Sequence, residues 1–194
     1  MSRFFLFFNK RNSYNLYFYL FVAFTIISYF LEIYHELWFF NEITLLIQAV
    51  SYLFLIMDAT NHFKMKSMNY FMFFYLFAII GLNTYLLFLH ISEIRIYIAS
   101  DITSLIYTFY YLNLGALGVT AMVYYLNSFS KKSMFFISLA ISLIFANVLR
   151  DMGVFYFKDI SVEISESIIR LGSSIFLVLY FVTSEKRLKL MNFT

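Results

Sequence analysis

SFSKKSMFFISLAISLIFANVLRD, residues 128–151, contains the pattern that decides the fold. Two lysines, Lys131 and Lys132, precede a mostly apolar run from Ser133 to Leu149, and Arg150 follows it. A helix needs about 20 mostly apolar residues to cross a hydrocarbon core of roughly 30 Å. The run therefore predicts a short membrane-spanning helix that starts beside a basic loop.

The composition of the whole chain also indicates a protein that lies in lipid. Of its 194 residues, 62% are apolar and only 13% are charged, whereas an ordinary soluble domain has about 25% charged residues. Such a chain has too little polar surface to cover itself in water. There is no cysteine, which excludes disulfides and thiolate chemistry. No basic run is long enough to suggest nucleic-acid binding.

Six stretches are long and apolar enough to span a bilayer. They are residues 14–34, 43–59, 68–89, 102–126, 133–149 and 164–183. Because backbone groups in lipid must be satisfied within each segment, such runs are helices. The sequence predicts an all-α transmembrane helix bundle of six spans, with five or seven still open, formed by residues 1–194 as a single integral membrane domain.

The basic residues predict the orientation of these spans. Ten of the fourteen lie before the first span, between the second and third, between the fourth and fifth, or after the sixth. Cytoplasmic loops carry the excess of Lys and Arg, so both termini are expected to be cytoplasmic. The predicted location is a bacterial inner membrane, with the lipid bilayer as the first partner.

Acidic residues collect on the opposite, outer side, which holds nine of the eleven together with His35 and His90. Residues three or four apart share a helix face, so Glu32 is expected to lie beside His35 at the end of the first span. Three interpretations of this outer rim remain open. It is a metal site, a carboxylate-based hydrolase site, or a solvated surface tied by pairs such as Glu166 with Arg170.

The metal interpretation rests on residue types. Imidazole and carboxylate ligands suit a divalent ion such as zinc, iron or manganese, and a Glu-x-x-His pair occurs in di-metal helical bundles. The candidate ligands are His35, Glu36, His90 and Glu93. A shared site requires the first and third spans to be neighbours at their outer ends.

The spans contain few other polar groups. Asp58, near the cytoplasmic end of the second span, is expected to reach water or to pair with Lys64. The amides Gln48, Asn83, Asn113 and Asn147 are interpreted as interhelical hydrogen-bonding groups, and Gly115-x-x-Gly118 as a site of close helix approach. Without proline, a repeat or a filter loop, transport is disfavoured.

At IIGLNTYLLF (residues 79–88) and IFANVLRD (residues 144–151) the chain resembles the YhhN family of lysoplasmalogenase-like membrane proteins. The resemblance covers about a third of the chain and implies a compact helical bundle that hydrolyses the vinyl-ether bond of lysoplasmalogens. The family carries a Gly-Asp pair and a later Ser-Asp pair. Here the aspartate of the first pair is absent, because Gly81 is followed by Leu82 and Asn83. Arg150-Asp151 stands in the place of the second pair. The family usually has eight spans.

Three functions are therefore compared. The favoured one is a non-enzymatic bundle, such as a sensor, scaffold or partner subunit with a solvated acidic rim. The second is a lipid ether or ester hydrolase in which Asp151 is the general acid or base, Glu32 or His90 assists, and the bundle binds the lipid chain. The missing family aspartate leaves open a relative that binds lipid without hydrolysing it. The third is a divalent-metal-binding membrane protein.

Overall fold

The computed structural model describes residues 16–32, 38–62, 70–98, 100–156 and 159–185. The elements in these ranges are six α-helices, which confirms the all-α prediction. They are α2 (Leu16–Glu32), α3 (Trp38–Asn61), α4 (Tyr70–Tyr97), α5 (Asp101–Ser128), α6 (Lys131–Phe155) and α7 (Ile160–Val182).

Five of these helices, α3 to α7, are long and apolar enough to cross a membrane by length and composition. Helix α2 is apolar over its 17 residues, which at 1.5 Å each extend about 25 Å. A bundle of such helices is a multi-pass membrane protein. The sixth span and the orientation stay predictions.

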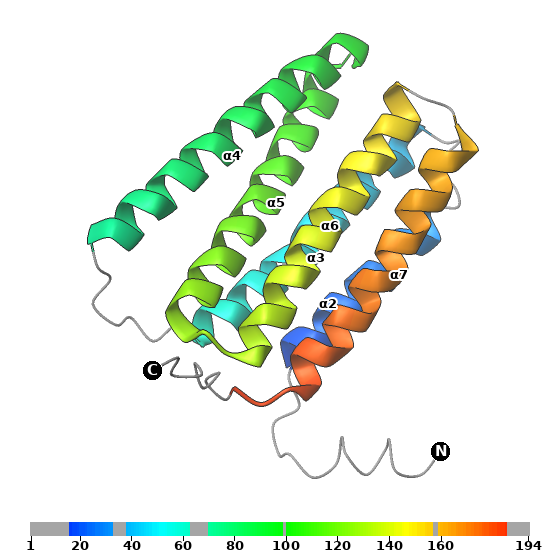
Figure 1. Cartoon of the computed structure of the whole chain (residues 1–194). Helices are drawn as coiled ribbons and strands as arrows, with labels where there is room; N and C mark the ends of the chain where they lie inside the picture. Colours follow the sequence, from blue (N-terminus) through cyan, green and yellow to red (C-terminus); the bar gives the residue numbers. More distant parts are fainter. Residues whose placement is uncertain (1–15, 33–37, 63–69, 99, 157–158, 186–194) are drawn as a thin grey trace, which may run out of the picture.

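The helices pack as a bundle with one outlying member. Helix α3 contacts α2 and α5, and α6 contacts α5 and α7, whereas α4 packs chiefly on α5. Figure 1 shows α4 at one edge of the molecule and α7 toward the opposite side. The centre of the bundle is aromatic, and Tyr110, Tyr124, Phe136 and Tyr180 are fully buried there.

Two glycines of α5 let it approach two different neighbours. A Cβ added to Gly115 would lie 3.1 Å from Leu87 Cδ1 of α4, and one added to Gly118 would lie 3.0 Å from Ile144 Cδ1 of α6. Distances this short are tighter than ordinary packing, so a side chain at either glycine would require Leu87 or Ile144 to shift. The close approach predicted for this motif is therefore present on both sides of α5.

The turn between α5 and α6 explains where α6 begins. Phe129 adopts a left-handed conformation (φ 43°), and the Ser130 side chain accepts a hydrogen bond from the Ser133 backbone N–H in a capping box. Helix α6 therefore starts at Lys131, so both lysines of the basic pair are helical. Their side chains point differently: Lys131 is exposed and Lys132 is buried.

We predict that reporter fusions ending after Lys66 and Lys132 will report the cytoplasm, whereas fusions near Ile96 and Lys158 will report the exterior. The reason is that Lys and Arg are concentrated in every second loop, and loops rich in these residues are cytoplasmic. Single cysteines at positions 66, 96, 131 and 158 provide an independent check by impermeant labelling, because the native chain has no cysteine and Lys131 is exposed. A single loop on the wrong side would contradict the six-span topology.

Candidate functional site

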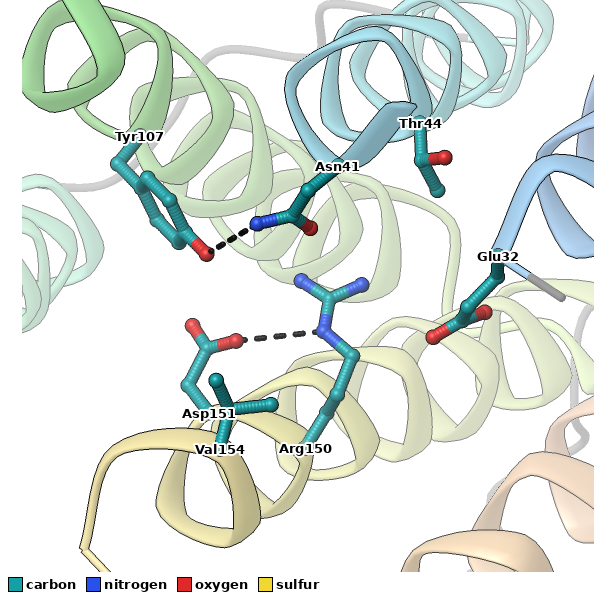
Figure 2. A pocket seen from close by; sticks show the side chains of 7 residues that line it. All are labelled: Glu32, Asn41, Thr44, Tyr107, Arg150, Asp151 and Val154. Atoms are coloured by element: carbon teal, nitrogen blue, oxygen red, sulfur yellow. Dashed lines mark hydrogen bonds and ion pairs between the residues drawn. The ribbon is translucent and has the colours of Figure 1, made fainter. Parts of the chain in front are cut away.

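A polar pocket of about 80 Å³ lies at the end of the bundle where α2 ends and α3 begins. Four helices supply its lining: α2, α3, α5 and α6 (Figure 2). The lining residues are Glu32, Asn41, Thr44, Tyr107, Arg150, Asp151 and Val154. Since a water molecule occupies roughly 30 Å³ in the liquid, this space fits a few waters or the reacting part of a larger molecule.

Asp151 is the most buried charged residue of this pocket, with only 1% of its surface exposed. It is buried because α6 continues to Phe155, so the residues after the apolar run stay helical and face the bundle. Tyr111 donates a short hydrogen bond to its Oδ2, and Arg150 Nε lies 3.2 Å from its Oδ1. Both carboxylate oxygens therefore have fixed partners.

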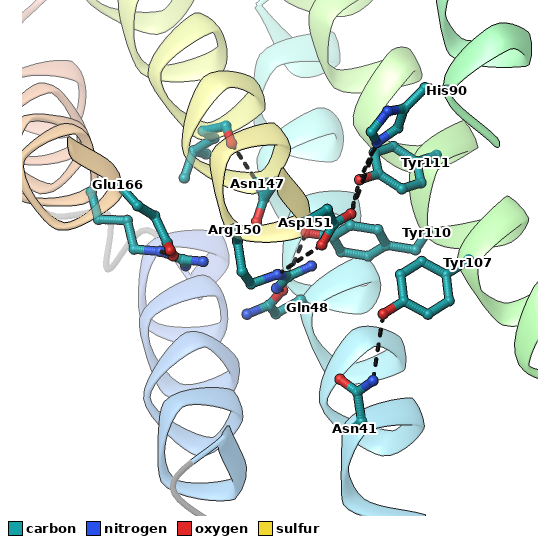
Figure 3. Close-up of polar contacts among 12 residues, drawn as sticks. Asn41, Gln48, His90, Tyr107, Tyr110, Tyr111, Asn147, Arg150, Asp151 and Glu166 are labelled. Carbon is teal, nitrogen blue, oxygen red and sulfur yellow. Dashed lines mark hydrogen bonds and ion pairs between the residues drawn. The ribbon is translucent and has the colours of Figure 1, made fainter. Parts of the chain in front are cut away.

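His90 reaches the same carboxylate through Tyr111. Its Nε2 lies 2.7 Å from the Tyr111 hydroxyl and 4.0 Å from Asp151 Oδ2. Because Tyr111 donates its proton toward Asp151, the His90 N–H is the donor to the Tyr111 oxygen. The three side chains form the chain His90, Tyr111, Asp151 across α4, α5 and α6 (Figure 3).

Arg150 is held by a second set of contacts. Its Nη1 donates to Gln48 Oε1 at 2.8 Å, and the Tyr110 hydroxyl donates to the same oxygen at 3.2 Å. The guanidinium also lies over the Tyr110 ring, 5.4 Å from its centroid. One amide from α3 thus fixes an arginine of α6 and a tyrosine of α5, which orients the pair Arg150 and Asp151 together.

Two guanidinium nitrogens near this site have no partner. Nη2 of Arg150 and Nη2 of Arg170 are buried, and neither makes a hydrogen bond to any residue that the structure describes. Arg170 otherwise donates from Nε to Glu166 at 2.6 Å and from Nη1 to the Tyr29 hydroxyl at 3.2 Å. The predicted pairing of Glu166 with Arg170 is therefore confirmed, and the side chains of both arginines are mostly buried.

The structure brings the three predicted acid–base residues close together. Glu32 and Asp151 line one pocket, and His90 joins Asp151 through Tyr111. The end of the bundle that is predicted to face outward thus carries a buried polar cluster as well as exposed acidic residues such as Glu93.

Of the four candidate metal ligands, the structure describes His90 and Glu93. His35 and Glu36 lie outside the described residues, so the metal hypothesis stays a prediction for that pair. Glu93 is exposed and accepts a 3.5 Å hydrogen bond from Tyr156, whereas His90 faces Tyr111. Within the described ranges, no three His, Asp or Glu side chains gather as metal ligands do.

Sequence reasoning missed the tyrosines and gave the amides only a general role. Tyr107, Tyr110 and Tyr111 of α5 all contact polar partners. Their spacing of three and four places them on one face of a helix, a signal that a generally aromatic composition obscures. Among the amides, Asn147 Nδ2 donates a hydrogen bond to the Tyr52 hydroxyl of another helix at 2.8 Å. Asn113 Nδ2 instead donates to the Phe109 carbonyl of its own helix.

A second polar cluster lies at the other end of the bundle. Asp58 is 3% exposed and accepts a 2.6 Å hydrogen bond from the Tyr180 hydroxyl. The expectation that its carboxylate reaches water is therefore wrong. Lys132 Nζ lies 2.9 Å from His62 Nε2 and 4.8 Å from the centre of the Tyr180 ring. His62 Nδ1 lies 3.7 Å from Glu185. The expected partner Lys64 lies outside the described residues.

The His62 imidazole predicts a pH dependence of stability. Burial, followed by the charge of Lys132, lowers its pKa below the ordinary value of 6.5. The unfolded chain then binds a proton more readily, so His62 is expected to reduce stability as the pH falls below 6.5. Between pH 7.5 and 5.5 the melting temperature should fall more for the wild type than for His62→Gln, which keeps an acceptor for Lys132. Equal falls would contradict the prediction.

Comparisons with protein-family models, with curated proteins and with solved structures found no match. The function of the polar pocket lined by Glu32 and Asp151 is therefore argued from its own residues and geometry.

Proposed function

We propose that the protein is a membrane-embedded hydrolase that cleaves an ether or ester bond of a lipid at the outer end of the bundle. The observation that carries this proposal is the presence of two carboxyl groups, Glu32 and Asp151, in the lining of one small pocket. Burying carboxyl groups is unfavourable unless they are compensated. Ionisable residues inside a membrane protein mark functional sites by default.

Two carboxyl groups can divide the work of hydrolysis. One protonates the departing part of the substrate and the other accepts a proton from the attacking water. For a vinyl ether, protonated Asp151 gives its proton to the vinyl carbon that does not bear the oxygen, and water adds to the carbon that does, while the water proton passes to Glu32. The C–O bond of the resulting hemiacetal then breaks as Glu32 returns this proton to the departing oxygen and Asp151 takes the proton of the hemiacetal hydroxyl. The products are an aldehyde and an alcohol, and both carboxyl groups regain their starting protonation states.

The surrounding side chains are suited to this assignment. Tyr111 and Arg150 hold the two oxygens of Asp151, so its carboxyl group is fixed in orientation, and His90 can exchange a proton with it through Tyr111. Preorganised groups of this kind need no rearrangement during reaction. We assign Asp151 as the general acid and base, Glu32 as the group that activates water, and His90 as a positioning residue.

The unpaired arginine nitrogens favour a lipid that carries an anionic group. Buried polar groups are normally hydrogen-bonded, and guanidinium groups bind phosphate and carboxylate oxygens well. Nη2 of Arg150 and Nη2 of Arg170 both lack a partner among the described residues. A lysolipid with a phosphate in its headgroup would supply the missing acceptors.

The resemblance to the YhhN family supports the same substrate class. Asp151, which stands in the second of the quoted motifs, lines the pocket, whereas Asn83 of the first motif lines a different groove. The acidic position missing at Asn83 therefore does not remove a carboxyl group from the pocket, because Glu32 provides the second one. We place the protein in a bacterial inner membrane, with the pocket on the outer side.

The test is to incubate the protein, purified without metal-chelating resin and embedded in lipid nanodiscs, with vinyl-ether, alkyl-ether and ester lysolipids. The hydrolase proposal expects an aldehyde from the vinyl ether or a fatty acid from the ester. A non-enzymatic sensor, scaffold or partner subunit releases neither product above the rate of empty nanodiscs. That outcome with all three substrates would favour the non-enzymatic interpretation.

A further inference from the structure

Helix α4 is the most exposed of the long helices. Only 6% of its apolar window is buried inside the protein, compared with 17% to 50% for α3, α5, α6 and α7. In Figure 1 it lies at the edge of the bundle, beside α5. Lipid tails are as apolar as its side chains, so exposure alone would not call for a protein partner.

A polar side chain in the middle of α4 makes this exposure unfavourable. Asn83 stands at the midpoint of Tyr70–Tyr97 and is exposed. Its Nδ2 donates to the backbone carbonyl of Ile79 at 2.9 Å. An amide offers two N–H donors and a carbonyl acceptor, and the Asn83 carbonyl has no hydrogen-bond donor among the described residues. Hydrocarbon chains provide none, and each unsatisfied group there costs several kcal/mol.

Asn83 lines a groove into which side chains of another helix can project. The groove has a volume of about 210 Å³ and is lined by side chains of α4, α5 and α6. Three small residues, Gly118, Ala121 and Ala140, contribute to its lining, and the two alanines are buried at its floor. Small residues leave room for the side chains of a neighbouring transmembrane helix. The remaining lining is mostly isoleucine, which suits the apolar surface of such a helix.

Depth in the membrane identifies the partner. Lipid headgroups and ester groups lie at the two interfaces, so a hydrogen-bonding partner at the midplane must come from a protein. In a symmetric dimer whose two-fold axis is perpendicular to the membrane, equivalent residues lie at equal depth. Asn83 of one copy then meets Asn83 of the other, and each amide can donate to the carbonyl of its partner.

We propose that α4 of a second copy of this chain packs across the groove and projects side chains into it, and that the resulting symmetric dimer is held by a reciprocal Asn83 amide pair at the membrane midplane. The interface is independent of the outer pocket, which is lined by α2, α3, α5 and α6. Dimer formation and lipid hydrolysis can therefore be tested separately.

The first experiment is cysteine cross-linking in native membranes. The native chain has no cysteine, so Ile80→Cys, one turn from Asn83 in the groove lining, places a single thiol in the interface. On addition of a membrane-permeant oxidant, Ile80→Cys should give a disulfide-linked dimer. The matched control is Ile175→Cys, at an exposed position of α7, which should give no disulfide-linked dimer. No dimer from Ile80→Cys, or equal yields from both, would overturn the proposal.

The second experiment tests the amide pair itself. In liposomes, energy transfer between labelled copies measures the dissociation constant of the dimer as the protein is diluted in lipid. Asn83→Leu should raise this constant roughly tenfold, because the dimer then loses its two hydrogen bonds between polar side chains in the membrane. Asn83→Gln should stay close to the wild type. Because Asn83 is exposed in the single chain, the leucine variant should fold normally, and an unchanged dissociation constant would overturn the proposal.

Discussion

Replacing Asp151 by asparagine is expected to lower the rate of lipid hydrolysis about 100-fold or more while the protein remains folded. Proton transfer by a positioned side chain typically contributes 10²- to 10⁴-fold to a rate. Asparagine has nearly the same shape and keeps an oxygen for Tyr111 or Arg150, but it cannot give or accept a proton. The measurement is turnover of whichever lysolipid the wild type hydrolyses.

The control for this variant is Asp101→Asn. The Asp101 side chain is fully exposed at the start of α5 and lies 3.8 Å from the exposed Arg95, so its loss should leave turnover within about twofold of the wild type. Thermal melting of both variants separates chemistry from stability. Undiminished turnover in Asp151→Asn would contradict the assigned role. A loss that merely follows the fraction of unfolded protein would make Asp151 a structural residue.

Tyr111 offers a finer test of the same arrangement. Its hydroxyl joins His90 to Asp151, so phenylalanine at this position disconnects the imidazole without removing the carboxyl group. Turnover by the folded Tyr111→Phe protein should then fall, whereas a merely structural tyrosine would lower turnover only in proportion to the fraction of unfolded protein.

The sequence predicted the helices well because hydrophobicity alone determines them in lipid. The six apolar runs correspond to the six helices, although α3 to α7 each extend beyond the apolar run at one or both ends. Helix α6 shows the reason. Backbone hydrogen bonding continues to Phe155, and Arg150 and Asp151 remain helical because the surrounding bundle supplies partners for their charges.

The lateral arrangement of the helices could not be predicted in the same way. Every span is apolar around most of its circumference, so the sequence does not show which neighbour a helix contacts. For this reason, the sequence could only suggest that Glu32 and Asp151 lie close together. The tyrosines that complete the site come from α5, whose alternation of polar and apolar residues is weak.

The adjacent lysines Lys131 and Lys132 also show that the sequence does not reveal which side chains enter the bundle. Lys131 and Lys132 read as one basic pair that marks a cytoplasmic loop, yet the first is exposed and the second is 8% exposed. Successive residues on a helix point about 100° apart. The capping box at Ser130 fixes the start of α6, and this start determines which lysine enters the bundle beside Tyr180.

The burial of Lys132 leads to the largest expected effect on stability. Lys132 and Asp58 are opposite charges that both contact Tyr180: the ammonium lies over its ring and the carboxylate accepts from its hydroxyl. Replacing one member of a buried pair leaves the other uncompensated, which typically costs about 3 to 5 kcal/mol. Lys132→Met and Asp58→Asn should each destabilise the folded protein by several kcal/mol in a denaturation series in detergent micelles.

Lys131→Met is the matched control, because it removes the same charge from an exposed side chain one residue away. Surface changes of this type usually stay within about 0.5 kcal/mol, so only the Lys132 variant should unfold early. The double variant Lys132→Met with Asp58→Asn should be more stable than the sum of the two single losses implies, because neither charge is then left alone. Strictly additive losses would show that the two groups are stabilised separately, with His62 and Tyr180 as their respective partners.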